Sequence, residues 1–470
     1  MNRKLALATL VAAATTPASA GKADVYAIVG AKLITVSGGS LEGATLVMRD
    51  GVIEALGPGA LAPPDARVID GKGLTLTPGL IDAFGGVGLP AAARPAAGAG
   101  GGAAAAAAAP AASLQPQAMA FERLRVGDAL RARDSGITTA LVIPQAGVLP
   151  GQSALLNLSG DKAEGMVLKQ PFAMHLHLAT LQRQYPSSLM GTVALARQSL
   201  YDAIHYRDSW AAYERSPKGH ARPKFDAGKA AWQDVLAGKQ TLVITASREN
   251  DIRRALALQD EFKIKIAVAG APRAWKLAAL VKQRKLPLYV TVNFDPPRAA
   301  AFGGFGGSPD EESQRKEVEE AEKNPAELQR AGVSFALVSG HAPSFLAGIR
   351  KAIERGLPRE AALKAVTLTA AELLGIADRS GSLEVGKMAN VVAWSGDPLA
   401  KDAKVKLVFV DGTYYEPQEE ERPQGGPGGP SPGYEDDEHG LRAQRDSLPR
   451  SERGSKGERR SAPLLNEVIR

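Results

Sequence analysis

Residues Leu76–Gly88 read LTPGLIDAFGGVG, and the expected fold and function of this chain both depend on them. The first half, LTPGLIDA, is apolar around a Pro-Gly turn, which is typical of a strand that delivers a catalytic loop. The second half places Phe84, Gly85 and Gly86 at the start of that loop. None of these three side chains can bind a metal ion or move a proton. The stretch therefore predicts the approach to an active site without the residues that would perform its chemistry.

The sequence on either side predicts two kinds of structure. Residues 25–68 alternate in the manner of short strands and carry the turn sequences SGG, DG and GPG. From about residue 129 to 375, apolar runs such as LVITAS alternate with amphipathic runs such as RENDIRRALALQDEF. This alternation predicts a parallel sheet covered by helices. Strand-like runs return after residue 373, where they could complete the first sheet.

The predicted fold class is therefore α/β, with a (β/α)8 TIM-like barrel inserted in a small composite β-sandwich. The sandwich is expected at residues 24–78 plus 380–416, and the barrel at 79–379. The barrel contains a low-complexity Ala/Gly loop at 90–112. Residues 417–470 are charged and rich in Gly and Pro, which predicts a disordered tail.

The N terminus, MNRKLALATLVAAATTPASA, has the features of a signal peptide at residues 1–20, with cleavage before Gly21. Its apolar run is too short to span a membrane, and no later run reaches spanning length. The chain has no cysteine, so neither disulfides nor thiolate metal ligands are expected. We expect the mature protein in the periplasm or secreted, with no membrane span.

The charge balance argues against one class of partner. The formal net charge is +7, but no dense basic stripe with interleaved aromatic residues is present. A nucleic-acid partner is therefore not expected.

Several segments resemble the amidohydrolase superfamily, especially its imidazolonepropionase-like and prolidase-like branch. The resemblance rests on YAIVGAKLITVSGGSLEGATLVMRDGVIEALGPG, LTPGLIDA, PGQSALLNLSG, VTLTAAELLGIADRSGSLEVGKMANVVAWSGDPL and VKLVFVDGTYYE. It implies a composite β-sandwich with a metal-dependent barrel. It also implies one or two divalent metals that generate hydroxide and polarise an amide or ester carbonyl. The implied ligands are a His-x-His after the first barrel strand, one His each after the fifth and sixth, and an Asp after the eighth.

The chain departs from this pattern at each of those places. The His-x-His positions hold Phe84 and Gly86, with PGLIDA anchoring the register. The later positions fall on Thr245 (or Ser247), Gly270 and Gly340. A bridging lysine is also missing, because Leu181, Gln182 and Arg183 stand where it would come. Hydroxyls and glycine cannot replace imidazole or carboxylate around zinc, so no cofactor is expected.

A rearranged metal site is the alternative. His175 and His177 in MHLHL would point to one side of a strand, and His341 should lie at the mouth of the last strand. Together with Asp82 or Asp251 they could hold a zinc-like divalent metal. The simpler interpretation is that these histidines pack and form local hydrogen bonds. Asp82, Arg248 and Asp251 are then polar residues of the barrel mouth that cap loops or helices.

Three functions remain open from the sequence. The first is an exported, catalytically degenerate relative of hydrolases that act on carbon–nitrogen bonds of amides, cyclic amides or peptides. It would bind a small molecule or peptide, or pair as a homo- or heterodimer with an active relative. The second is an active hydrolase that uses His175, His177 and His341. The third is an envelope-binding protein that acts through its charged tail.

Overall fold

The computed structural model describes residues 25–90, 114–144, 147–181, 185–294, 311–340 and 345–417. The predicted signal peptide lies outside these residues. So do nearly all of the Ala/Gly loop, nearly all of the tail, and His341. Within the described part of the chain, no helix is both long and apolar enough to cross a membrane.

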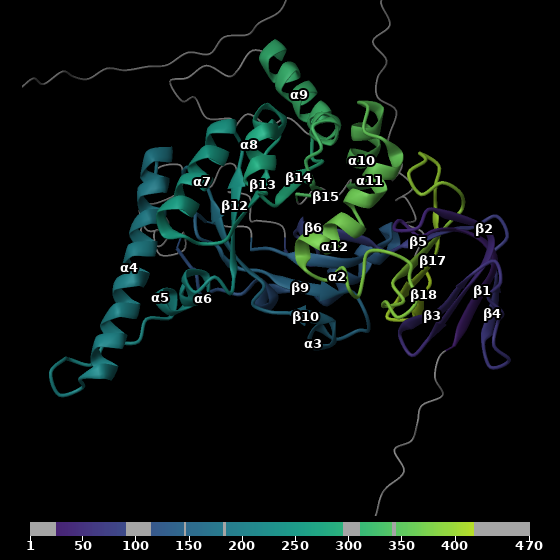
Figure 1. The fold of residues 1–470 in the computed structure, drawn as a ribbon, viewed down its shortest axis with the longest axis horizontal. Coiled ribbons are helices and arrows are strands. Elements are labelled where there is room, and N and C mark those ends of the chain that lie inside the picture. The colour runs from purple at the N-terminus through teal and green to yellow at the C-terminus, as the bar shows by residue number, and fades with distance from the viewer. Residues whose placement is uncertain are drawn as a thin grey trace, which may run out of the picture. The chain divides into compact units, whose positions relative to one another are not determined.

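One eight-stranded sheet takes its strands from both ends of the described chain (Figure 1). Its order is β18-β17-β16-β5-β1-β2-β3, with β4 paired to β1. The strands are β1 (Tyr26–Ile34), β2 (Ser40–Arg49), β3 (Val52–Gly57), β4 (Arg67–Asp70), β5 (Thr75–Pro78), β16 (Val391–Trp394), β17 (Val405–Val410) and β18 (Thr413–Tyr415). Strands β16 to β18 thus join the first sheet, as the strand-like runs after residue 373 predicted. The domain limits given above stay a prediction.

The other strands form two further sheets. The four-stranded sheet has the order β10-β9-β7-β6, and the six-stranded sheet has the order β15-β14-β13-β12-β11-β8. Their bounds are β6 (Leu80–Gly85), β7 (Ile137–Val142), β8 (Gly151–Gln152), β9 (Ala154–Asn157), β10 (Val167–Lys169), β11 (Ala173–His177), β12 (Thr241–Ala246), β13 (Ile266–Gly270), β14 (Leu288–Thr291) and β15 (Ala336–Val338).

The closed barrel expected from the sequence is not confirmed. Strands β11 to β15 are parallel, and β6 is parallel to β7. However, β9 runs antiparallel to β7 and β8 runs antiparallel to β11, so the two sheets do not share one continuous parallel ladder. Hydrogen bonds still join the two sheets. The Gly340 amide donates to the Phe84 carbonyl, and the amide of Ser153, the residue between β8 and β9, donates to the Ala173 carbonyl. The described residues thus show a mixed α/β fold.

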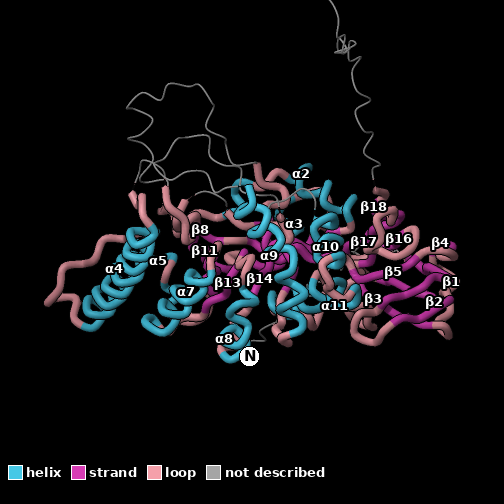
Figure 2. Tube along the Cα trace, turned by 90° about the horizontal axis from the view of Figure 1, so that it is seen from above, coloured by secondary structure: helices cyan, strands magenta, loops and turns pink. Residues whose placement is uncertain are grey.

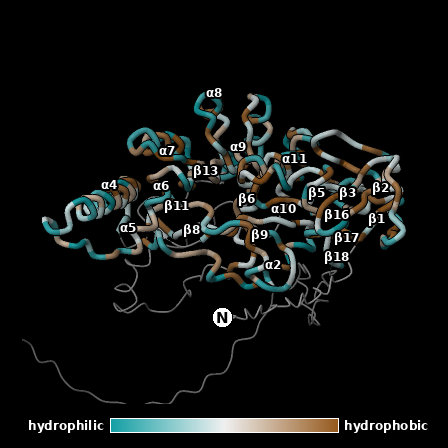
Figure 3. The backbone as a smooth tube through the Cα atoms, turned by 60° about the horizontal axis from the view of Figure 1, so that its bottom comes forward, coloured by the Kyte–Doolittle hydropathy of each residue, from teal (hydrophilic) through white to brown (hydrophobic). Residues whose placement is uncertain are grey.

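Helices cover the outer side of the parallel strands (Figure 2). The helices of the described chain are α2 (Val126–Arg131), α3 (Ala163–Met166), α4 (Leu189–Arg215), α5 (Ala227–Ala231), α6 (Gln233–Leu236), α7 (Glu249–Phe262), α8 (Ala278–Gln283), α9 (Glu311–Arg330), α10 (Phe345–Glu354), α11 (Arg359–Ala365) and α12 (Leu368–Leu374), with 3-10 turns at Ala120–Arg123, Ala132–Ser135 and Ala274–Leu277. Among them, α12 contributes Ala370, Ala371 and Leu374 to the core that also holds Phe84. The hydropathy colouring shows hydrophobic segments in strands such as β6 and β9 and hydrophilic outer turns in α8 (Figure 3).

Both faces of the parallel strands are buried, which explains their continuous apolar runs. Successive residues alternate between two cores. On β13, Val268 packs in the core under the helices, whereas Ala267 and Ala269 belong to the core enclosed by the strands. The second core also contains Phe84 and Tyr289. This alternation decides which residues of each strand can line an internal site.

Candidate functional site

The carboxyl ends of β6 and β15 are joined by a buried carboxylate. Asp82 on β6 is 0% exposed, and its Oδ2 accepts a hydrogen bond of 2.6 Å from the Ser339 hydroxyl. Its Oδ1 accepts from the Ser339 amide at 3.1 Å and from the Phe84 amide at 3.4 Å. Burial raises the pKa of Asp82, although these hydrogen bonds act in the opposite direction. Asp82 therefore ties together two strands that lie far apart in the sequence.

The side chain of Phe84 points into the core that the strands enclose, and not toward solvent at the strand ends. Its side chain is 5% exposed. Its ring centroid lies 5.9 Å from that of His175 and 6.5 Å from that of Tyr289, with the two six-membered rings nearly parallel. Tyr289 is itself buried, which raises the pKa of its phenol. The first residue of the expected His-x-His thus contributes an aromatic ring to a packed core. Gly86 follows directly after β6 and offers no side chain.

The ends of β13 and β15 carry glycines with left-handed backbone conformations. Gly270 has φ +86°, and a Cβ added there would lie 2.9 Å from the Ala246 carbonyl oxygen. Gly340 has φ +56°, and its added Cβ would lie 2.3 Å from the Thr291 hydroxyl oxygen. Both distances are shorter than the contacts that real Cβ atoms make with neighbouring atoms. Close packing of the backbone therefore leaves no room for the Cβ of a histidine or an aspartate at either position.

Thr245 lies between two neighbouring strands at the same edge. It pairs with His177 on β11 and with Ala269 on β13. Its hydroxyl is buried and has no hydrogen-bond partner among the described residues. A threonine hydroxyl is a poor substitute for imidazole as a zinc ligand.

The two histidines of MHLHL lie two residues apart on β11, as the sequence predicted for a strand. His175 is 0% exposed and contacts Phe84, whereas His177 is half-buried near the carboxyl end. His341, the third member of the alternative metal site, is not among the described residues. In the part of the chain that the structure covers, no group of three His, Asp or Glu side chains is placed to hold a metal ion.

Arg248 and Asp251 belong to a helix start. Asp251 Oδ2 accepts hydrogen bonds from the amides of Ser247 at 3.2 Å and Arg248 at 3.0 Å. Its Oδ1 accepts from Arg254 at 2.8 Å. Asp251 is thus occupied in capping α7, while Arg248 is exposed. The hydrogen-bond partners of Asp82 in the described residues are Phe84 and Ser339, not Arg248 or Asp251.

Two residues of this region were not predicted from the sequence. Ser339 holds Asp82, and Tyr289 stacks on Phe84. The alternation in LPLYVTV could have placed Tyr289 and Thr291 on one side of a strand, but no local pattern connects either residue to β6.

Comparison with known proteins shows which family this chain resembles. A model of the amidohydrolase family matches residues 310–414. An imidazolonepropionase of Pseudomonas putida is 28% identical over 394 residues, which cover 76% of this chain and 88% of that protein. The chain is thus similar to the amidohydrolase superfamily and, within it, to imidazolonepropionases.

Two further proteins are similar to this chain, one over a short segment and one over most of its length. The amidohydrolase tasK of Hapsidospora irregularis is 41% identical over 63 residues, but these cover 13% of this chain and 6% of that protein. The crystal structure of an amidohydrolase from Thermotoga maritima MSB8 has a TM-score of 0.70 and 23% identity. The match covers 83% of this chain and 100% of that one, so the two share a fold.

Proposed function

We propose that this amidohydrolase-superfamily protein is exported and catalytically degenerate, and that it acts by binding a ligand or by pairing with an active relative. Its lineage is that of hydrolases that act on carbon–nitrogen bonds of amides, cyclic amides or peptides. The proposal is supported chiefly by Phe84, whose ring packs into the core at the first expected ligand position.

The donor set at the other expected positions agrees with this proposal. Thr245 offers a hydroxyl, and Gly270 and Gly340 offer no donor and no room for one. A hydrolytic zinc site needs imidazole and carboxylate ligands with an open coordination position. The described residues at the family positions do not fit such a metal, so we derive no catalytic step through one.

The alternative is an active metal-dependent hydrolase with ligands from His175, His177 and His341. It is supported by the positions of His175 and His177, which lie two apart on β11 and so share one side of the strand. Because the Pseudomonas putida relative is an imidazolonepropionase, a cyclic amide of the imidazolone type is the test substrate.

Metal analysis separates these two functions. Protein purified without chelator should contain much less than one equivalent of zinc, manganese or iron by mass spectrometry. It should not hydrolyse imidazolonepropionate after metal addition. Matched variants are His177→Asn with His341→Asn, and His205→Asn as an exposed control. One equivalent of metal that disappears only in the double variant, together with hydrolysis, would establish the alternative.

The partner role has its own test. Sedimentation velocity of the mature chain, alone and mixed with an active relative from the same genome, should show a dimer in one of the two samples. A monomer in both samples, with no change in the relative's turnover, would leave ligand binding as the only role of this proposal.

A further inference from the structure

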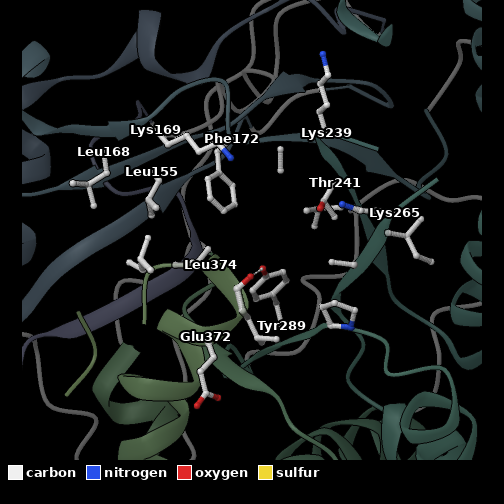
Figure 4. A pocket seen from close by; sticks show the side chains of 18 of the residues that line it. Leu155, Leu168, Lys169, Phe172, Lys239, Thr241, Lys265, Tyr289, Glu372 and Leu374 are labelled. Carbon is white, nitrogen blue, oxygen red and sulfur yellow. Dashed lines mark hydrogen bonds between the residues drawn. The ribbon is translucent and has the colours of Figure 1, made fainter. Parts of the chain in front are cut away.

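A cavity of about 530 Å³ opens at the amino ends of the parallel strands (Figure 4). Its lining includes Ala173 and Thr241, the first residues of β11 and β12, and Pro287 immediately before β14. The expected metal-ligand positions lie at the other ends of these strands. On β12, Thr241 and Thr245 are four residues apart, or about 13 Å along a strand. The cavity therefore opens at the opposite strand ends from the expected metal-ligand positions, although Tyr289 both lines it and stacks on Phe84.

The inner wall of this amino-end cavity is apolar and aromatic. It includes Leu155, Phe172, Val243, Tyr289 and Leu374. Figure 4 shows Phe172, Thr241 and Tyr289 around the hollow, with Leu374 beside it. Its volume lies within the range of about 300–1,000 Å³ that small-molecule sites occupy. The wall suits the carbon skeleton of a small organic ligand.

The rim of the cavity is cationic. Three lysines and one arginine contribute to the lining (Lys169, Lys239, Lys265 and Arg379), against a single carboxylate, that of Glu372. Within the described ranges, Lys169, Lys239 and Lys265 form no ion pair. Figure 4 shows the Lys265 amine beside Thr241 and the Lys169 amine beside the Phe172 ring, whereas Glu372 extends away from the hollow. The cations nearest the opening are thus not neutralised by the protein itself.

An anion inside the hollow would be attracted by Lys169 on the side of Phe172 and by Lys265 on the side of Thr241. Lys169 already lies 5.5 Å from the centre of the Phe172 ring, so its amine is positioned next to the apolar wall. A ligand with a charged head and an apolar body would match both parts of the cavity. A neutral ligand would leave the cationic rim unused, and a cationic ligand would be repelled by it.

We propose that this cavity binds an amphipathic organic anion, with its head group at Lys169 and Lys265 and its apolar body against Phe172 and Tyr289. Octanoate is a suitable probe, titrated calorimetrically into the full mature chain. We expect one site per chain, with a dissociation constant that increases as salt rises from about 50 to 500 mM because salt screens the exposed cations.

Charge variants test the position of the site. Lys169→Glu combined with Lys265→Glu should weaken octanoate binding by about tenfold or more. Lys218→Glu with Lys224→Glu changes the net charge equally at exposed positions outside the cavity, and should change binding by less than about twofold. Lys169→Gln with Lys265→Gln should give an intermediate affinity. Circular dichroism and melting temperature confirm that each variant is folded.

Two results would overturn the proposal. The first is the absence of saturable octanoate binding, or equal affinities for the wild type and the Lys169→Glu, Lys265→Glu variant. The second is binding of octyltrimethylammonium as tightly as octanoate, because an apolar pocket without charge preference would behave in that way. Neither result depends on metal content or hydrolysis, so this inference and the proposed function can fail separately.

Discussion

At the scale of single residues, Phe84 is a buried part of the core that the strands enclose. It lies where the family pattern would place an imidazole, but its ring is 5% exposed and packs against Tyr289. The same backbone position thus contributes burial of apolar surface where a ligand would contribute metal binding.

Truncating this ring should destabilise the protein. Phe84→Ala leaves a cavity in the core, and we expect a loss of about 3–5 kcal/mol in apparent unfolding free energy. Urea unfolding followed by circular dichroism measures it. Phe225→Ala is the matched control, because Phe225 is 76% exposed, and it should cost less than about 0.5 kcal/mol. Equal effects of the two substitutions would show that Phe84 is not part of the packed core.

The buried carboxyl of Asp82 should make the stability of the folded protein depend on pH. Burial raises its folded-state pKa above the unfolded value of about 4. Between these two pKa values the folded protein binds more protons than the unfolded chain, so this carboxyl makes stability fall as pH rises. Asp82→Asn removes the titration. Its stability relative to the wild type should therefore improve from pH 4 to pH 7.

Unfolding free energies at pH 4, 5.5 and 7 measure this effect, with the exposed Asp402→Asn as control. If the unfolding free energies of wild type and Asp82→Asn changed with pH in the same way, Asp82 would have the same pKa in the folded and unfolded states.

A side chain at position 340 should destabilise the protein for steric reasons. Gly340→Ala would place its Cβ 2.3 Å from the Thr291 hydroxyl oxygen. Gly375 has a similar φ of +68°, but open space around the added Cβ. Gly375→Ala should therefore cost only the left-handed backbone strain, about 1–2 kcal/mol. Gly340→Ala should cost about 1–3 kcal/mol more. Similar melting temperatures for the two variants would argue against close packing at the end of β15.

At the scale of elements, local patterns identified the strands well. The runs ITTALVI, QTLVITAS, KIKIAVAG, LPLYVTV and VSFALVSG contain β7, β12, β13, β14 and β15. These strands are buried on both faces, and such burial leaves a strong apolar signal. The antiparallel strands β8 and β9 were not predicted, since each is short and GQSALLN carries no clear alternation.

Helix α7 provides a prediction at this scale. Asp251 accepts hydrogen bonds from two amides before the first turn, so Asp251→Ala should reduce stability by about 0.5–2 kcal/mol. The neighbouring Asn250→Ala is the control, because Asn250 is exposed. Thermal unfolding compares the two. A larger loss in Asn250→Ala would contradict the capping role of Asp251.

At the scale of the whole molecule, long-range contacts join the first sheet to the remaining strands. Within the first sheet, strand β16 pairs with β5, and Trp394 Nε1 donates to the Thr77 hydroxyl at 2.9 Å. The contact to the remaining strands starts from the residue just before β16. Asn390 Nδ2 donates to Asn157 Oδ1 at 2.8 Å. The segment after residue 380 is therefore needed to complete the sheet from which LTPGLIDA leads into β6.

Export is a prediction about the complete chain. The full-length protein expressed in a Gram-negative host should be recovered from the periplasmic or culture fraction, and its N-terminal sequence should begin at Gly21. Exchange of Arg3 and Lys4 for glutamate should retain the precursor in the cytoplasm. A soluble cytoplasmic protein that still begins with MNRKLAL would refute both export and cleavage.

The sequence by itself predicted most of the parallel strands and the helices between them, and it carried the resemblance to the amidohydrolase superfamily. These features are local, because periodicity and a fixed motif register are written within short segments. Only the tertiary structure decided that Asp82 meets Ser339, that Gly340 lies against Thr291, and that basic side chains surround the amino-end cavity. It also placed the described strands after residue 79, except β16 to β18, in a four-stranded and a six-stranded sheet, so the predicted barrel is not confirmed. Such distances depend on how strands that are remote in the sequence pack together, and no local pattern specifies them.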